Sequence, residues 1–424
     1  MSSILGRIKT SPVAMWIIKI GAYGFCALGL VYLGQKAFFD DPFSLDFKYF
    51  WVAGEVWAKG ESPYTSAFSD LGAVFFPTEN QLYVWAYPPN WWPVSTFLAL
   101  FEHQAAIGIW RAMSAAMILG GAYFLRQSLS AQDIRAPAIW VAFFIGFAAT
   151  MQSTAYSLNV GQTGVLIYFG ACLLSYGVLA KRQAFIVAAV ILLMLKPHVG
   201  GLVSLFLVVR PQYFRSVVIA GVISVLFALP AFIVGGFSGT ITGLLTNLSA
   251  YSGSAANVPG ITFGLQSLIF WLFNIDKVGF GYYAVIALLT LFASWRWFPE
   301  NNNKAADKTP QTMMREFSLV LAVIAFVLPL HSYDLLFLLP ILFFTPYFRR
   351  YEAIVIAAAF LIMYRYINVA ELFAKPGDKG CLNIAPCSTI TASMGTIGEL
   401  MIVLALAAPA ILAYGQGMKR LASK

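Results

Sequence analysis

The sequence predicts an all-α polytopic membrane protein that forms one domain over residues 1–424. Hydrophobic residues make up 60% of the chain and charged residues only 11%, whereas soluble domains carry about 25% charged residues. Apolar runs near 20 residues in length recur along the chain, and a helix of that length spans a bilayer. Helices are expected because a membrane-spanning segment must satisfy its backbone hydrogen bonds internally.

The apolar runs define the predicted spans in order. They lie at about 12–38, 104–126, 136–153, 163–180, 216–236, 278–298, 316–331, 333–348, 351–370 and 394–414. Two shorter runs, 183–195 and 199–209, flank Lys196-Pro197-His198 and predict a hairpin of short helices. We therefore expect about twelve membrane segments in all.

The positions of Lys and Arg predict the orientation. The net charge is +9, from 27 Lys and Arg against 18 Asp and Glu, and loops that stay in the cytoplasm are enriched in cations. Counting spans from a cytoplasmic N-terminus puts most of these cations inside, including Lys181-Arg182 and Arg349-Arg350. Both termini are therefore expected in the cytoplasm, and the positive charge reflects orientation without implying nucleic-acid binding.

The same orientation puts the long loops 39–103, 237–277 and 371–393 outside. The first loop mixes aromatic and acidic residues, and its stretch 45–59 has apolar positions at helical spacing. Such a segment predicts a helix lying at the membrane interface. The inner segment 299–315 is polar and is expected to be a flexible connector.

Two cysteines, Cys381 and Cys387, lie close together in the outer loop 371–393. Disulfides form in oxidising compartments such as the periplasm. We expect a disulfide that staples this loop.

Several cationic side chains lie in or near the outer halves of predicted helices, where ionisable groups are costly and often functional. They are Arg111, Lys196, His198, His331 and Arg365. Their convergence would suit an anionic ligand such as a phosphate ester, because Lys supplies a point charge and Arg a planar fork of donors. Alternatively, each cation snorkels to the interface or pairs with an acid such as Asp334 or Glu371.

Asp46 follows the first span at the start of the predicted interfacial helix. A carboxylate at a helix N-terminus is stabilised in its ionised form, which a general base requires. Asp46 is thus a candidate to deprotonate a sugar hydroxyl. The commoner role for an Asp at this position is the N-cap of the helix 47–59, and the two roles are compatible.

Small polar residues and tyrosines near the outer turns are candidates for binding sugar hydroxyls. They are Tyr64, Tyr87, Asn159, Gln162, His198, Tyr333 and Asp334. Gly161 and Gly164 would let the backbone approach a ligand closely, although ordinary turn chemistry also explains them. We expect no metal and no cofactor, because no tight acidic cluster and no nucleotide-binding motif occurs; the pair Asp40-Asp41 alone leaves a metal open.

Short motifs occur in a fixed order along the chain. They are Asp40 with Asp46-Phe47 and Phe50, then Gly60-Glu61-Ser62-Pro63-Tyr64, Tyr87-Pro88-Pro89, Asn159-Val160-Gly161-Gln162-Thr163-Gly164 and Leu195-Lys196-Pro197. This ordered set resembles the membrane glycosyltransferases of family 87. That family includes the polyprenyl-phosphate-mannose-dependent mannosyltransferases and belongs to the GT-C superfamily. The resemblance runs over most of residues 12–340.

The resemblance implies a GT-C-like enzyme of the bacterial plasma membrane with its active site on the periplasmic side. By resemblance, Asp46 matches the catalytic base, and Lys196 and His331 would face the donor phosphate, with Arg111 and Arg365 as further candidates. The implied reaction moves a hexose, mannose by family analogy, from a polyprenyl-phosphate sugar to a glycolipid or lipid-linked acceptor. Inversion at the anomeric carbon is expected.

Three alternatives remain at this level. A transporter or flippase of lipid-linked sugars would also place cations in the outer half, although such proteins usually show internal repeats and none is evident here. A GT-C enzyme with another sugar or a preassembled glycan as donor would share these motifs. A non-catalytic assembly subunit would be expected to tolerate changes at Asp46.

Overall fold

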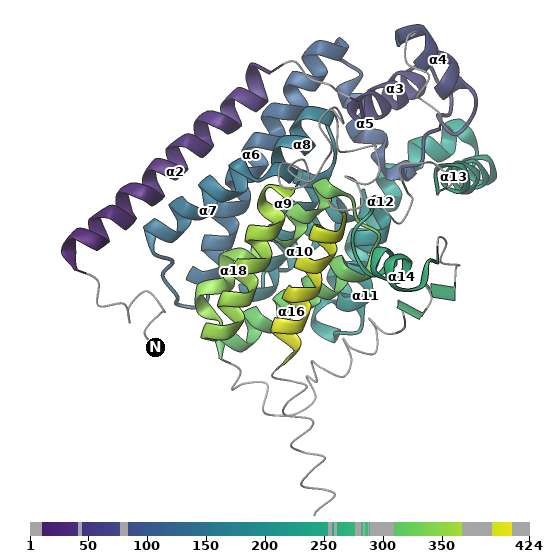
Figure 1. Cartoon of the computed structure of the whole chain (residues 1–424). Coiled ribbons are helices and arrows are strands. Elements are labelled where there is room, and N and C mark those ends of the chain that lie inside the picture. Colours follow the sequence, from purple (N-terminus) through teal and green to yellow (C-terminus); the bar gives the residue numbers. More distant parts are fainter. Residues whose placement is uncertain are drawn as a thin grey trace, which may run out of the picture.

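The structure, a computed structural model, describes only part of the chain. The described residues are 11–40, 45–76, 84–252, 257, 261–275, 281–282, 285–286, 288, 309–366 and 392–408. Their regular elements are helical, apart from one isolated antiparallel bridge between Phe263 and Leu330. The prediction of an all-α protein is confirmed for this part of the chain (Figure 1).

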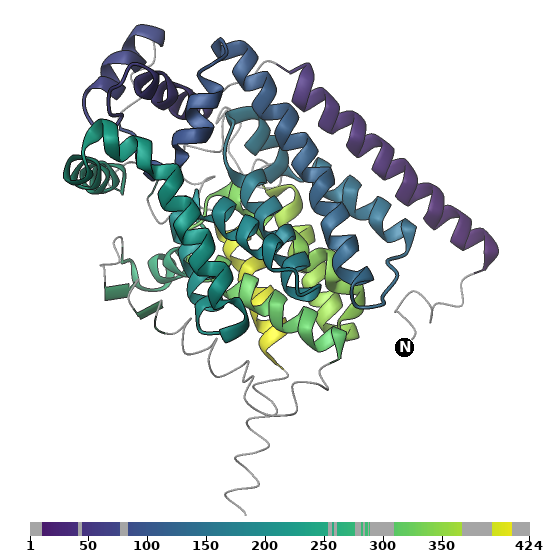
Figure 2. The ribbon, with the colours of Figure 1, turned by 180° about the vertical axis from the view of Figure 1, so that it is seen from behind.

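The first long helix, α2 (Pro12–Phe38), runs along the outside of the bundle (Figure 1 and Figure 2). It packs on α7 (Ala138–Thr150) and α6 (His103–Ser130). Close packing depends on Gly29, because a Cβ there would lie 2.8 Å from the Gly146 Cα. Most of the other α2 side chains are exposed and apolar, as expected of a helix that faces lipid.

The centre of the bundle is a run of short helices, of which all but the first are apolar. They are α8 (Gln152–Val160), α9 (Gly164–Leu179), α10 (Gln183–Met194) and α11 (Pro197–Val208), followed by the longer α12 (Pro211–Gly235). The hairpin predicted around Lys196 is confirmed, because α10 ends before it and Pro197 begins α11. The segment 136–153 is not one straight span: α7 and α8 meet at a bend of 47°.

Helices of the first loop gather at one end of the molecule, close to α13 (Phe237–Ser252) (Figure 1). They are α3 (Phe47–Ala58), α4 (Ala67–Phe75), the short η1 (Pro89–Trp91) and α5 (Trp92–Leu98). The predicted helix at 45–59 is therefore present. It does not lie open on the membrane, because α4, α5 and aromatic side chains bury Phe50, Trp51 and Val52.

The later part of the chain returns to the bundle. Its elements are α14 (Leu265–Phe273), α16 (Pro310–Val327), η4 (Ser332–Leu338), α17 (Leu339–Phe344), η5 (Thr345–Tyr347), α18 (Arg350–Tyr364) and the helix Ala392–Ala408. The connector predicted at 299–315 ends earlier than expected: Thr309 caps α16, accepting a hydrogen bond from the Thr312 N–H, and Pro310 begins it. Residues 299–308 and the predicted disulfide pair, Cys381 and Cys387, lie outside the described residues.

Within the described part, four helices are long and apolar enough to cross a membrane, namely α2, α6, α12 and α16. The bent pair α7 and α8 makes a fifth if it counts as one span. Several further apolar helices are shorter, including α9, α10 and α11. These helices are those of a membrane protein; the number of about twelve segments and the orientation of the termini stay predictions.

Candidate active site

A backbone hydrogen bond to the end of α8 holds Asp46 in position. Its N–H donates a hydrogen bond of 3.0 Å to the carbonyl oxygen of Val160, the last residue of α8. Gly161 follows with φ of +75°, and a Cβ there would lie 2.4 Å from the Phe47 Cβ. Only glycine fits this left-handed position beside another chain segment. The glycine turn that ends α8 therefore holds the residue that begins α3.

The Asp46 side chain does not cap α3. Asp46 stands at the N-cap position, but its side chain makes no capping hydrogen bond. The carboxyl group instead lies near the Gln162 side chain, which lowers its pKa. Asp46 therefore does not act as a side-chain cap of α3 in this structure. Its carboxyl group remains free to accept a proton.

Gln162 is buried and its amide has a fixed orientation. Its Oε1 accepts hydrogen bonds from the Thr163 N–H at 2.9 Å and from the Thr163 hydroxyl at 3.2 Å. Its Nε2 is therefore the donor, and it reaches the Tyr87 hydroxyl at 3.2 Å. The Tyr64 hydroxyl donates to the Tyr87 carbonyl oxygen at 2.7 Å, so Tyr64 positions the loop that presents Tyr87.

Burial raises the pKa of Asp46 to about 6. The Gln162 hydrogen bond and the Lys196 charge lower it, while Asp334 raises it further. Part of Asp46 remains accessible, so protein surrounds the carboxyl group without sealing it off. A carboxylate with a pKa near 6 is ionised at neutral pH and is a stronger base than a solvated one.

Lys196 lies at the junction of α10 and α11 and pairs with Asp334. Its Nζ is 2.5 Å from each Asp334 carboxylate oxygen, and both residues are buried. Asp334 also accepts a hydrogen bond of 3.1 Å from the His331 backbone N–H. For Lys196, pairing with Asp334, which the sequence analysis left open, is the arrangement observed.

His331 is held at the start of η4. Its ring stacks on Tyr333 with centroids 5.4 Å apart, and its Nε2 lies 3.2 Å from the Asn257 Oδ1. The Lys196 Nζ is 5.0 Å from the centroid of the same Tyr333 ring. Lys196, His331, Tyr333 and Asp334 therefore form one cluster.

One turn connects this cluster to Asp46. Gly164 begins α9, and a Cβ there would lie 2.4 Å from the Tyr333 carbonyl oxygen. The residues 161–164 thus pack against Phe47 at one end and Tyr333 at the other. The carboxyl group of Asp46 lies close enough to Lys196 and Asp334 for their charges to affect it. We refer to Asp46, Gln162, Tyr87 and the Lys196 cluster together as the candidate active site.

Arg111 was expected beside Lys196 and His331, but its contacts lie at the end of α2. Its guanidinium donates to the carbonyl oxygens of Lys36 and, at 2.7 Å, Asp40. Those carbonyls belong to the end of α2, where helical carbonyl groups lack partners. Arg111 therefore holds the chain end that leads into the first loop, and none of its described contacts reaches Lys196 or His331.

Arg365 is also separate from the Lys196 cluster. Its guanidinium carbon lies 5.7 Å from the ring centroid of Tyr32 and 5.5 Å from that of Tyr364. Both rings belong to residues on the α2 and α18 side of the bundle. The described contacts thus do not support the expectation that Arg111 and Arg365 complete a single phosphate site.

The two remaining candidates occupy distinct positions. His198 lies in the first turn of α11 and is exposed, two residues from Lys196. Asn159, at the end of α8, has a buried side-chain oxygen without a hydrogen-bond partner in the described part of the chain. Such an oxygen is an acceptor available to a hydroxyl group.

Sequence reasoning missed three residues beside the site. Tyr156 of α8 stacks on Tyr333 with centroids 6.0 Å apart. Burial and the Asp46 charge raise the pKa of Tyr251, on α13, to about 12. Asn257 contacts His331 from the same loop. No local pattern in the sequence distinguishes these residues; only their positions in the folded chain show that they lie beside the site.

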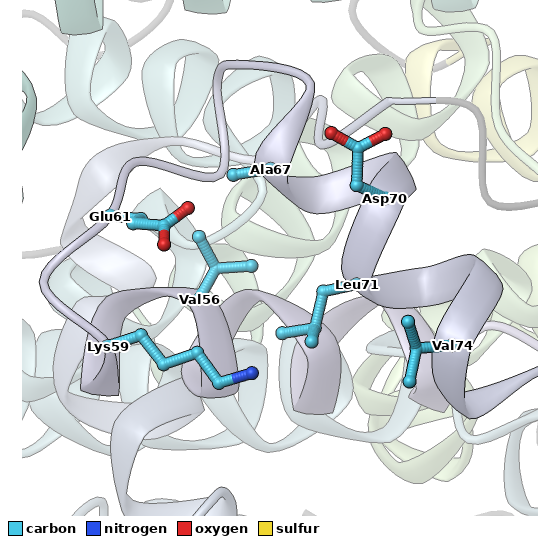
Figure 3. A pocket seen from close by; sticks show the side chains of 7 residues that line it. All are labelled: Val56, Lys59, Glu61, Ala67, Asp70, Leu71 and Val74. Atoms are coloured by element: carbon cyan, nitrogen blue, oxygen red, sulfur yellow. The ribbon is translucent and has the colours of Figure 1, made fainter.

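A cavity of about 170 Å³ lies elsewhere, between α3 and α4 (Figure 3). It is lined by Val56, Lys59, Glu61, Ala67, Asp70, Leu71 and Val74. Asp46 precedes α3 and these residues surround its far end, so about 15 Å of helix separates them. This cavity is not part of the candidate active site. No group of three or more possible metal-ligating side chains occurs among the described residues.

A described part that is helical, with helices long and apolar enough to span a membrane and a carboxyl group near a buried lysine, fits a membrane glycosyltransferase. Residues 85–328 match the model of Glycosyltransferase family 87. The match covers more than half of the chain, which therefore belongs to this family. Comparisons with curated proteins and with solved structures gave no match.

The matched region contains Tyr87, Gln162 and Lys196 but neither Asp46 nor His331. Both residues outside it are tied to it by contacts. The Asp46 N–H bonds to the Val160 carbonyl oxygen, and the His331 N–H bonds to Asp334, which pairs with Lys196. The candidate active site thus combines the family region with the segments on either side of it.

Proposed function

We propose that this membrane glycosyltransferase transfers a hexose, mannose by analogy with the family, from a polyprenyl-phosphate sugar to a hydroxyl group of a glycolipid or lipid-linked acceptor. Asp46 is the general base. The observation that carries the proposal is the position of the Asp46 carboxyl group, which makes no capping hydrogen bond and lies close enough to Lys196 and Asp334 for their charges to shift its pKa. The site would face the periplasm from the bacterial plasma membrane.

In this mechanism Asp46 accepts the proton of the acceptor hydroxyl as its oxygen attacks the anomeric carbon. The new carbon–oxygen bond forms on the face opposite the phosphate, so the configuration inverts. The bond from the anomeric carbon to the phosphate oxygen breaks, and its electron pair leaves with the polyprenyl phosphate. Gln162 and Tyr87, next to Asp46, are placed to bind hydroxyl groups of the sugar or acceptor.

Negative charge grows on the leaving phosphate, and the Lys196 ammonium, although paired with Asp334, is suited to stabilise it. Asp334 holds the Lys196 ammonium in a fixed position by accepting from it with both oxygens. The third proton of the ammonium remains for a phosphate oxygen. His331 offers a ring nitrogen from the neighbouring position. The chemistry that these residues supply requires no metal.

The test is transfer by the purified protein in liposomes, with a polyprenyl-phosphate sugar and the membrane lipids of the producing cell as acceptors. Asp46→Asn keeps the shape of the side chain and removes its basicity, so activity should fall about 10²–10⁴-fold. Asp70→Asn, an exposed carboxyl group on α4, is the matched control and should retain activity. Full activity of folded Asp46→Asn would rule out Asp46 as the base.

A second measurement concerns the donor. His331→Ala should raise the KM for the polyprenyl-phosphate sugar more than the KM for the acceptor. Equal effects on both constants would contradict a role at the donor phosphate, while leaving the role of Asp46 intact. Transport of lipid-linked sugar without transfer by the wild-type protein would favour the flippase instead.

A further inference from the structure

A second group of cations lies at the end of α2 and includes side chains from two distant parts of the chain. The Arg365 guanidinium carbon and the Lys36 Nζ each lie 5.7 Å from the centroid of the Tyr32 ring. Tyr364 flanks Arg365 on its other side, at 5.5 Å. We call these four residues the α2–α18 cation site.

The α2–α18 cation site retains positive charge. Lys36 is paired with Asp40, whose carboxylate oxygen lies 2.5 Å from its Nζ. Arg365 has no acidic partner among the described residues and contacts only aromatic rings. Aromatic faces hold a guanidinium through cation–π attraction without neutralising it. Among the described residues, the site therefore has one cation more than its acids neutralise, which favours an anion.

The site is also held in place by polar contacts. The Tyr364 hydroxyl lies 2.5 Å from the Thr150 hydroxyl, which fixes it to the end of α7. Arg111 binds the carbonyl oxygens of Lys36 and Asp40 and so secures the last turn of α2. The Tyr364 ring and the last turn of α2 thus have little freedom, which lowers the entropic cost of binding.

The helices that carry the cations also expose apolar side chains. Val31 and Phe38 of α2 and Leu361 of α18 are each at least 64% exposed. A cation bordered by exposed apolar surface matches an amphiphile, whose phosphate meets the cation while its acyl chains cover the apolar residues. A small soluble anion would leave that surface uncovered. The site therefore suits a membrane lipid.

The site is distinct from the Lys196 cluster. Thr150 contacts Tyr364 at one end of the bent α7–α8 pair, and Tyr156 stacks on Tyr333 further along. Thr150 ends α7 and Tyr156 lies in α8, beyond the 47° bend between the two helices. A phosphate held by Arg365 is therefore a different phosphate from one held beside His331.

We propose that the α2–α18 cation site binds the phosphodiester group of an anionic phospholipid, whose acyl chains lie along α2 and α18. This proposal does not depend on the proposed sugar transfer. It replaces the expectation that Arg365 binds the donor phosphate. α18 begins at Arg350 on the side predicted to be cytoplasmic, and Arg365 follows its last residue, towards the opposite side. The positive-inside rule therefore does not explain a cation at this position. A bound lipid phosphate does explain it.

The test is lipid binding to the purified full-length protein, measured by native mass spectrometry. Phosphatidylglycerol, the neutral-headgroup phosphatidylcholine, a polyprenyl phosphate and soluble glycerol phosphate are added separately. Wild-type protein should prefer phosphatidylglycerol to phosphatidylcholine. Arg365→Gln should weaken phosphatidylglycerol binding about fivefold, as expected for the loss of one interfacial cation, and leave polyprenyl phosphate binding unchanged. Lys59→Gln, an exposed lysine beyond α3, is the control and should change neither.

Several outcomes would overturn the proposal. Unchanged phosphatidylglycerol binding by Arg365→Gln would do so, as would a loss confined to polyprenyl phosphate, which would return Arg365 to the donor site. Competition by glycerol phosphate at equal concentration would show a soluble-anion site instead. Lys36→Gln removes a cation from a different helix and should reproduce the loss in smaller degree if Arg365→Gln does not fold. Asp46→Asn should bind phosphatidylglycerol normally, so failure of the proposed transfer would leave this result untouched.

Discussion

The backbone N–H of Asp46 donates a 3.0 Å hydrogen bond to the carbonyl oxygen of Val160. This bond joins the first loop to the turn that ends α8, more than one hundred residues later in the chain. The next residue, Gly161, is left-handed and touches Phe47 where a Cβ would not fit. The position of the proposed base therefore depends on a glycine that carries no chemistry itself.

The first prediction concerns that glycine. Gly161→Ala should lower kcat/KM about 100-fold, because relieving the clash with Phe47 moves Asp46, and a displacement near 1 Å has an effect of that size. The variant should also lose about 1–3 kcal/mol of stability from backbone strain. Transfer assays and thermal melts measure both. Gly108→Ala on α6, where a Cβ meets open space, should behave as wild type; equal activity of the two variants would contradict the positioning role.

The second prediction concerns pH. Because burial raises the pKa of Asp46 to about 6, the base becomes protonated below that pH. The value of kcat/KM for the wild-type enzyme should be constant near pH 7.5 and fall about tenfold per unit below pH 6. A pH–rate profile checks this. The residual rate of Asp46→Asn should not fall in this way below pH 6. If the fall persists in that variant, a group other than Asp46 causes it.

The third prediction uses Gln162, whose hydrogen bond lowers the pKa of Asp46. Gln162→Glu places a second carboxyl group beside the first, which raises the pKa of one member of the pair. The acidic limb of the pH–rate profile should therefore move to higher pH. Gln162→Met removes the hydrogen bond without adding charge and should move it less. A profile identical to the wild type in both variants would mean that Gln162 does not contact the base.

The fourth prediction concerns stability at the same position. The folded-state pKa of Asp46 is raised above its unfolded value near 4, so the ionised carboxyl group destabilises the folded protein above pH 6. That penalty disappears as the pH falls from 6 to 4. Asp46→Asn should therefore stabilise the protein at pH 7.5, by about 2 kcal/mol after allowance for partial exposure. The gain in thermal midpoint should vanish at pH 4; a less stable variant at pH 7.5 would contradict it.

Local patterns were sufficient to predict much of the fold. Apolar composition and run length predicted an all-α membrane protein, and Lys196-Pro197 predicted the break between α10 and α11, because proline starts helices readily and ends them. The bend between α7 and α8 was missed, since no proline or glycine stands at Met151. Its cause is tertiary packing, which a single sequence does not display.

The candidate site shows the same division. Asp46, Gln162 and Lys196 belong to short motifs that resemble a known family, so their association was predictable. Arg111 and Arg365 were grouped with them because they share a predicted depth, yet helices at the same depth lie on different sides of the bundle. The sequence indicates how deep a residue lies in the membrane. On which side of the bundle it lies follows only from helix packing, such as that of α2 against α6 and α7.

The last prediction concerns the buried pair of Lys196 and Asp334. Asp334→Asn leaves the Lys196 ammonium buried without its counter-charge, and breaking such a pair destabilises a protein by about 3–5 kcal/mol. The double variant Lys196→Met with Asp334→Leu removes both charges and should restore the thermal midpoint close to the wild-type value. It should not restore transfer, because the ammonium proposed to stabilise the leaving phosphate is gone. Thermal melts of the three proteins in one detergent, with transfer assays alongside, separate the two roles. Recovery of activity in the double variant would exclude Lys196 from catalysis, and a wild-type midpoint for Asp334→Asn would show that the pair does not stabilise the fold.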